Sequence, residues 1–171
     1  TYNIRPALAY NVTKEEHRWN ATVKSIISSL PDTDTVLFSF GQIDSASHFP
    51  KQAQLQDRPI EDVALDAAHD YFNFIVEISQ AYNKQVIIYG PVTAGNMEVT
   101  DFLFKEKLLG AKIFTEYLQD RCKDVDGIEI LPLYELLVDD EDTDKIKSEY
   151  FYDKTHLGTK ILPYLIEKIN E

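Results

Sequence analysis

The chain has 171 residues, a length that fits one domain, and its contents of 44% hydrophobic and 27% charged residues are ordinary for a globular protein. Its formal net charge of -12 argues against nucleic acid or an anionic membrane as the main partner, because phosphate binding needs clustered Lys and Arg. No run approaches the roughly 18 apolar residues of a membrane span. The single cysteine, Cys122, excludes an internal disulfide and a multi-cysteine zinc site.

Short apolar runs alternate with longer helical patterns along the chain. The first half of the chain predicts an edge strand within 4–12, a helix from Lys14 capped by Thr13, and a strand at 35–40 (TVLFSF). A helix over 60–83 and a strand at 85–90 (QVIIYG) follow. The last part predicts a helix over 100–121, a weaker strand at 127–133 and a final helix from about 161. This alternation is typical of β-α-β units with a parallel sheet covered on both faces. We expect an α/β fold: a flavodoxin-like three-layer α/β/α sandwich, as a single domain over 1–171.

The stretch YFYDKTHLGTK, 150–160, places Asp153 three residues before His156, just ahead of the final helix. A serine hydrolase needs an imidazole to take the proton of its nucleophile and a carboxylate to orient that imidazole. Two side chains three apart in a tight turn can meet. The alternative is that Asp153 and Thr155 cap the last helix and that His156 is a surface residue.

A second polar stretch, GQIDSASHF at 41–49, directly follows the first predicted buried strand. In open parallel sheets ligands bind beyond the carboxyl ends of the strands. Glycine lets backbone amides approach a ligand closely, and such amides can donate to an oxyanion. Alternatively, the segment is an ordinary polar loop after a strand. The candidate oxyanion and substrate-binding residues are Gly41, Gln42, Asp44, Ser45 and His48.

Taken together, the two stretches resemble the SGNH/GDSL hydrolase superfamily. VLFSFGQIDSASHF looks like its third sequence block, which contributes to the oxyanion hole, and YDKTHL looks like its fifth block, which carries the catalytic Asp and His. The resemblance covers the order of elements over roughly 1–171. It implies that His156 is the general base, that Asp153 is its orienting partner and that no cofactor or metal is used. The usual Asn of the third block is replaced by Ile43, so the chain looks most like the G-x-I-D branch.

The nucleophile of the family, a Ser in a Gly-Asp-Ser motif after the first strand, has no counterpart in the chain. Three explanations remain open. The first residue is Thr1 rather than Met, so an upstream segment carrying that strand and its Ser can be missing, and the domain would then lack its first strand. The protein can have become a non-catalytic domain. Another serine can serve, either Ser45 in the polar loop or Ser39, which the strand pattern places in the core.

The first hypothesis is therefore an ester hydrolase or acyltransferase acting on O-acyl groups, with a small-molecule or glycan ester as substrate, since many members of the family deacetylate carbohydrates. The alternative is a non-catalytic glycan-binding or interaction module of the same fold. Tyr10 and the YFY at 150–152 can form an aromatic rim for a sugar, although tyrosines at strand ends often only pack. An open sheet edge would favour an oligomer or a completing segment. The cysteine content fits a cytoplasmic protein and also a Cys-poor secreted one.

Overall fold

The protein has an α/β fold built on a three-stranded parallel sheet. The computed structural model describes residues 7–91, 102–131, 133–139, 146–152 and 156–170. The strands are β1 (Val36–Ser39), β2 (Val86–Tyr89) and β3 (Ile128–Leu131), in the spatial order β1-β2-β3. Val36 is in register with Val86, and Val86 with Ile128. All three strands fall where the apolar runs predicted them.

The helices, in chain order, are α1 (Ala9–Val12), α2 (Arg18–Ser28), α3 (Phe49–Gln56), α4 (Ile60–Tyr82), α5 (Phe102–Cys122), α6 (Leu133–Leu137) and α7 (Leu162–Asn170). Three short turns complete the described elements: the π-helical turn η1 (Asp44–His48) and the 3-10 turns η2 (Ser148–Tyr150) and η3 (Thr159–Ile161). The predicted helices over 60–83 and 100–121 correspond to α4 and α5. The first two positions of the second predicted helix, 100 and 101, lie outside the described residues.

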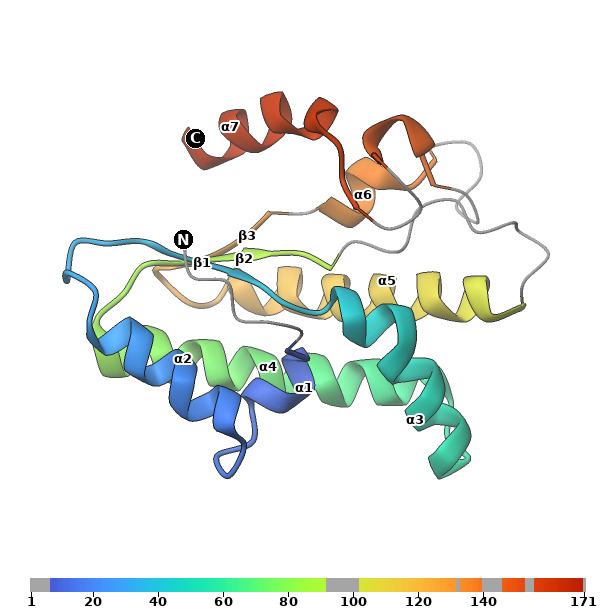
Figure 1. Cartoon of the computed structure of the whole chain (residues 1–171), viewed down its shortest axis with the longest axis horizontal. Coiled ribbons are helices and arrows are strands. Elements are labelled where there is room, and N and C mark those ends of the chain that lie inside the picture. The colour runs from blue at the N-terminus through green and yellow to red at the C-terminus, as the bar shows by residue number, and fades with distance from the viewer. Residues whose placement is uncertain (1–6, 92–101, 132, 140–145, 153–155, 171) are drawn as a thin grey trace.

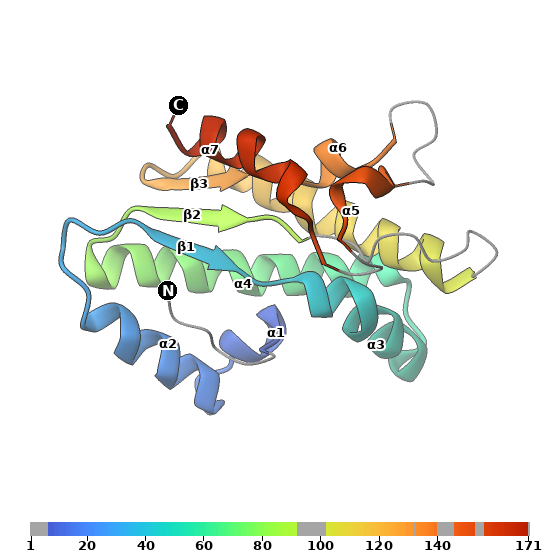
Figure 2. The same cartoon turned by 45° about the horizontal axis from the view of Figure 1, so that its top comes forward.

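The two long helices α4 and α5 lie side by side on one side of the sheet, and α7 lies on the other (Figures 1 and 2). The strand order explains this placement. A right-handed crossover puts its helix on one particular face, so a sheet that grows in one direction collects both crossover helices on the same face. The core between these helices and the sheet is aromatic, with ring centroids of Tyr71 and Phe49 at 5.8 and 5.7 Å from that of Phe114.

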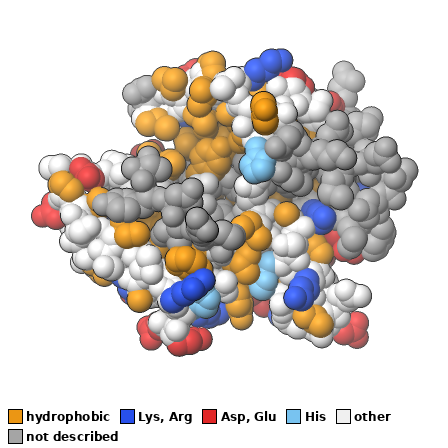
Figure 3. Space-filling view, viewed as in Figure 1, with side chains coloured by type: hydrophobic (Ala, Val, Ile, Leu, Met, Phe, Trp, Pro, Cys, Tyr) orange, Lys and Arg blue, Asp and Glu red, His pale blue; other side chains and the backbone are white. Residues whose placement is uncertain are grey.

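The opposite face of the sheet is less well covered. Leu37, in the middle of β1, is 49% exposed, and α7 exposes the large apolar side chains Leu162, Ile166 and Ile169. Figure 3 shows hydrophobic side chains gathered on the surface around α7. Among the described residues, β1 has a sheet neighbour on one side only. Parallel strands are normally buried on both faces, so the exposure of Leu37 on this face of β1 is unusual.

The predictions for the N-terminal region were wrong. The expected edge strand within 4–12 is described from residue 7 onward, and there Ala9–Val12 forms the helix α1 in place of a strand. Thr13 does not start a helix at Lys14. It ends α1, and its hydroxyl donates to the carbonyl of Tyr10 at 2.8 Å. The next helix begins at Arg18, where His17 Nδ1 accepts from the backbone N–H of Trp19 at 3.2 Å.

Candidate functional site

Gly41 marks the point where β1 gives way to a helix at the carboxyl edge of the sheet. Its φ is +102°, a conformation that L side chains rarely adopt, and a Cβ there would lie 3.2 Å from the Cβ of Pro91. The predicted polar loop at 41–49 is helical from Gln42 onward, through η1 into α3. Since the first amides of a helix point out of its end, this arrangement directs N–H groups of the first turn toward the edge of the sheet.

Asp44 is fully buried and has a structural role that the sequence did not reveal. Its carboxylate accepts hydrogen bonds from the backbone N–H of Ala9 at 2.7 Å and of Tyr10 at 3.2 Å, so it caps the start of α1. Burial raises the pKa of this carboxyl from 3.8 to about 6, although the two backbone hydrogen bonds act in the opposite direction. A buried carboxylate engaged in this way does not contact a bound substrate.

Ser45 is also fully buried, so the expectation that it binds substrate or acts as a nucleophile needs correction. Its backbone N–H donates to the carbonyl of Gly41 at 2.9 Å, and its hydroxyl donates to the carbonyl of Gln42 at 3.1 Å. Ser39 was expected in the core, yet it is exposed as the last residue of β1. The reason is the open face of the sheet, because Ser39 alternates with the buried Phe38.

The segment that carries His156 is a closed turn. Phe151 and Leu157 form an antiparallel bridge, the N–H of Tyr152 donates to the carbonyl of His156 at 2.8 Å, and that of Gly158 donates to the carbonyl of Tyr150 at 2.7 Å. His156 itself is exposed. Asp153 lies outside the described residues.

The helical region at the end of the chain begins with η3, whose N-cap is Gly158. The alternative explanation, in which Asp153 and Thr155 cap this helix, falls on residues outside those that the structure describes. Backbone hydrogen bonds join 150–152 to 156–158, and His156 is exposed to solvent.

Both predicted motifs border the carboxyl end of β2. The side chains of Phe151 and Leu157, at the base of the His156 turn, belong to the apolar cluster that includes Tyr89, the last residue of β2. Gly41 abuts Pro91, two residues beyond the end of the same strand. The structure therefore brings the Gly41 segment and the His156 turn to one edge of the sheet.

His48, by contrast, lies on the helical side of the molecule. Its ring centroid is 4.7 Å from that of Tyr10, and both residues line a cavity of about 210 Å³ together with residues of α3 and α4. Burial, and secondarily the charge of Lys51, lowers the pKa of His48. The sequence marked His48 and Tyr10 separately, but it gave no sign that Arg58, Asp66 and Asp70 share their cavity.

The described residues contain no group of three or more His, Cys, Asp or Glu side chains arranged to hold a metal ion. Within the same residues, no helix is both long enough and apolar enough to cross a bilayer. No family model, curated protein or solved structure matches the chain significantly.

Proposed function

We propose that this chain belongs to an ester hydrolase or acyltransferase of the SGNH type, with a flavodoxin-like three-layer fold. The observation that carries the proposal is the placement of both motifs near the carboxyl end of β2, where Gly41 abuts Pro91, and where Phe151 and Leu157 pack against the same apolar cluster as Tyr89. Ligands of open parallel sheets bind at that edge. The motif resemblance alone would not require the two segments to approach the same strand.

In this proposal His156 is the general base and Asp153 orients its imidazole. The nucleophilic serine gives its proton to His156 as its oxygen attacks the ester carbonyl. Backbone amides at Gly41 and the following turn donate to the oxyanion that forms. The imidazolium then protonates the leaving alcohol, and water, activated by the same His156, releases the acyl group. Asp44 and Ser45 support this arrangement from within the core.

The resemblance places the serine at the end of a strand earlier in the chain than β1. Among the described residues β1 pairs with β2 alone, and a strand added on its other side would bring its serine beside Gly41. We therefore propose a nucleophile in a segment upstream of Thr1. Ser39 is the alternative within the described residues, because it is exposed at the carboxyl end of β1 and is in register with Tyr89.

The test is labelling of the native protein, from its own source, with a serine-directed fluorophosphonate, followed by peptide mass mapping. The same protein carrying His156→Ala should lose labelling and ester turnover by about 100-fold or more. His69→Ala is the matched control. His69 is also exposed, but it lies on α4, where its Nδ1 is 2.8 Å from the hydroxyl of Tyr117, so labelling should persist.

The labelled peptide distinguishes the two nucleophiles. A label upstream of Thr1 that depends on His156 supports the proposal as stated, and a label on Ser39 supports the hydrolase with a different nucleophile. Absence of any label on the folded protein would refute the serine-hydrolase proposal and leave a non-catalytic module of the same fold as the better explanation.

A further inference from the structure

The cavity beside His48 is distinct from the sheet edge at which the proposed reaction takes place. It lies between the start of α1, the η1–α3 segment and the first turns of α4, and its volume is about 210 Å³. Its lining is mostly polar, with only two apolar side chains, Val63 and Ala67, from α4. What it can bind follows from the arrangement of the polar groups.

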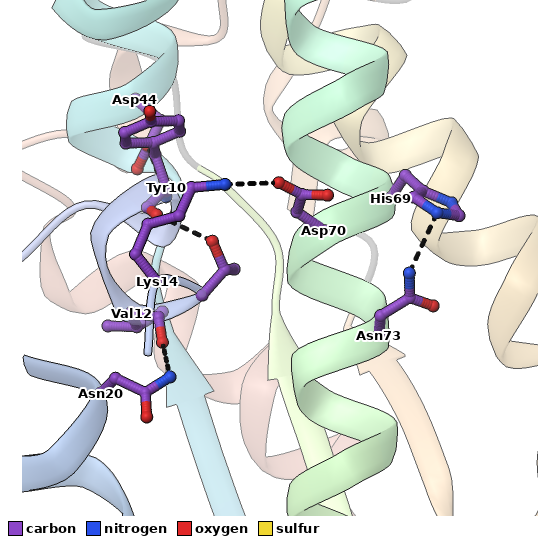
Figure 4. A network of polar contacts seen from close by, with 9 residues as sticks. Tyr10, Val12, Lys14, Asn20, Asp44, His69, Asp70 and Asn73 are labelled. Atoms are coloured by element: carbon purple, nitrogen blue, oxygen red, sulfur yellow. Dashed lines mark hydrogen bonds and ion pairs between the residues drawn. The ribbon is translucent and has the colours of Figure 1, made fainter. Parts of the chain in front are cut away.

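One wall is an aromatic pair held in place by a lysine. The rings of Tyr10 and His48 lie 4.7 Å apart with an interplanar angle of 36°. Lys14 Nζ lies 4.8 Å from the centroid of the Tyr10 ring and forms a 2.8 Å ion pair with Asp70 of α4 (Figure 4). Tyr10 remains 40% exposed, so its ring is accessible from the cavity side and from solvent.

The other wall is a chain of planar polar groups. Gln56 Nε2 donates to Gln52 Oε1 at 2.9 Å, Arg58 Nη1 donates to Gln56 Oε1 at 3.3 Å, and Arg58 Nη2 donates to Asp66 Oδ2 at 2.8 Å. These links join solvent-exposed side chains, and they place the polar groups of Gln56, Arg58 and Asp66 next to one another along this wall. Each amide and carboxylate also keeps hydrogen-bonding capacity, because it has more donors or acceptors than one partner uses.

The charged side chains of the cavity lining are paired, although Lys14 is not itself part of the lining. Arg58 is paired with Asp66, and Lys14 with Asp70. A small anion would meet two carboxylates, and a metal ion would have to displace two cations. An apolar ligand would remove water from the remaining donors and acceptors of these groups and would replace none of the lost hydrogen bonds. A neutral ligand rich in hydroxyl groups avoids all three penalties.

We propose that this cavity binds a sugar ring of a neutral carbohydrate. The hydroxyl groups of the sugar exchange hydrogen bonds with Gln52, Gln56 and Asp66, and its C–H groups lie against the exposed part of the Tyr10 ring. This pairing of planar polar groups with an aromatic face matches the two surfaces of a sugar ring. The inference does not depend on the proposed esterase reaction, since a carbohydrate can be held here whether or not the sheet edge is catalytic.

The test is titration of the full ¹⁵N-labelled chain with D-glucose, D-galactose and N-acetyl-D-glucosamine, each up to about 50 mM, monitored by two-dimensional NMR. At least one sugar should shift the side-chain amide signals of Gln52 and Gln56 in a saturable way. Gln52→Ala should weaken the affinity for that sugar by about three- to tenfold, which corresponds to the loss of one hydrogen bond. Gln54→Ala is the matched control, because Gln54 lies on α3 between the two but lines a different hollow.

Each outcome bears on the inference. Saturable shifts that Gln52→Ala weakens and Gln54→Ala preserves would support it. Shifts unaffected by Gln52→Ala would place the sugar elsewhere and overturn it, as would the absence of saturable shifts with every sugar. Inorganic phosphate, titrated in parallel, tests the anion alternative, and saturable shifts with phosphate alone would also overturn the inference.

Discussion

Replacing the buried Asp44 by asparagine should change how the stability of the protein depends on pH. The pKa of Asp44 is raised from 3.8 to about 6 because its carboxyl is buried. Between these two values the unfolded chain releases the proton while the folded chain keeps it. The free energy of unfolding therefore falls as pH rises through this window, and it levels off above about pH 6.

The size of this effect follows from the shift. A difference of about two pKa units corresponds to about 3 kcal/mol of stability lost between about pH 4 and about pH 7.5. Asparagine has nearly the shape of the carboxyl and offers a carbonyl oxygen to the N–H of Ala9, but its NH2 group cannot accept from the N–H of Tyr10. The prediction therefore concerns the change with pH: Asp44→Asn should lack this loss, so that its stability relative to the wild type rises by up to about 3 kcal/mol between about pH 4 and about pH 7.5.

The measurement is urea unfolding of both proteins at the two pH values, followed by far-UV circular dichroism. Asp62→Asn, an exposed carboxylate in the first turn of α4, is the control for removing one negative charge from a chain of net charge -12. If the wild type and Asp44→Asn change in parallel with pH, the carboxyl of Asp44 does not titrate in a buried state and the reasoning is refuted.

Two further substitutions test the packing around the same region. Gly41→Ala should lower the free energy of unfolding by about 2 kcal/mol, because alanine at a φ of +102° is strained and its Cβ would meet Pro91. Urea unfolding measures this change, and an unchanged free energy of unfolding would contradict that geometry. The hydroxyl of Tyr71 is fully buried and has no hydrogen-bond partner among the described residues, so Tyr71→Phe should raise the free energy of unfolding by about 1 kcal/mol. Thermal unfolding measures the second change, and a lower transition temperature would show that the hydroxyl has a partner.

The sequence predicted the strands and long helices well because their signals are local. Apolar runs such as TVLFSF and QVIIYG end at glycine, and α4 and α5 carry apolar residues at helical spacing over more than twenty positions. The N-terminal region was mispredicted because Thr13 can begin or end a helix. Where the first helix begins depends on Asp44, because its carboxylate accepts a hydrogen bond from the N–H of Ala9, 35 residues earlier in the chain.

The stretch from Gln42 to His48 was predicted as a loop because Gly, Ser and Asp are typical of turns. It is helical because tertiary contacts outweigh that preference: Asp44 turns inward to α1, and Phe49 is buried against Phe114. The cavity could not be predicted at all. Its aromatic wall joins Tyr10 to His48, its ion pair joins Lys14 to Asp70, and no local pattern connects positions so far apart in the sequence.

The π-helical turn η1 has a consequence for how this protein can vary. A π turn spans one residue more than an α turn, so it holds an extra residue with little change in the relative rotation of its two ends. A chain with one residue fewer between Asp44 and His48 can close this segment as an ordinary α turn. The cap of α1 and the ring of His48 in the cavity would then keep nearly the same relative positions. Related proteins can therefore differ here by one residue and still keep both features.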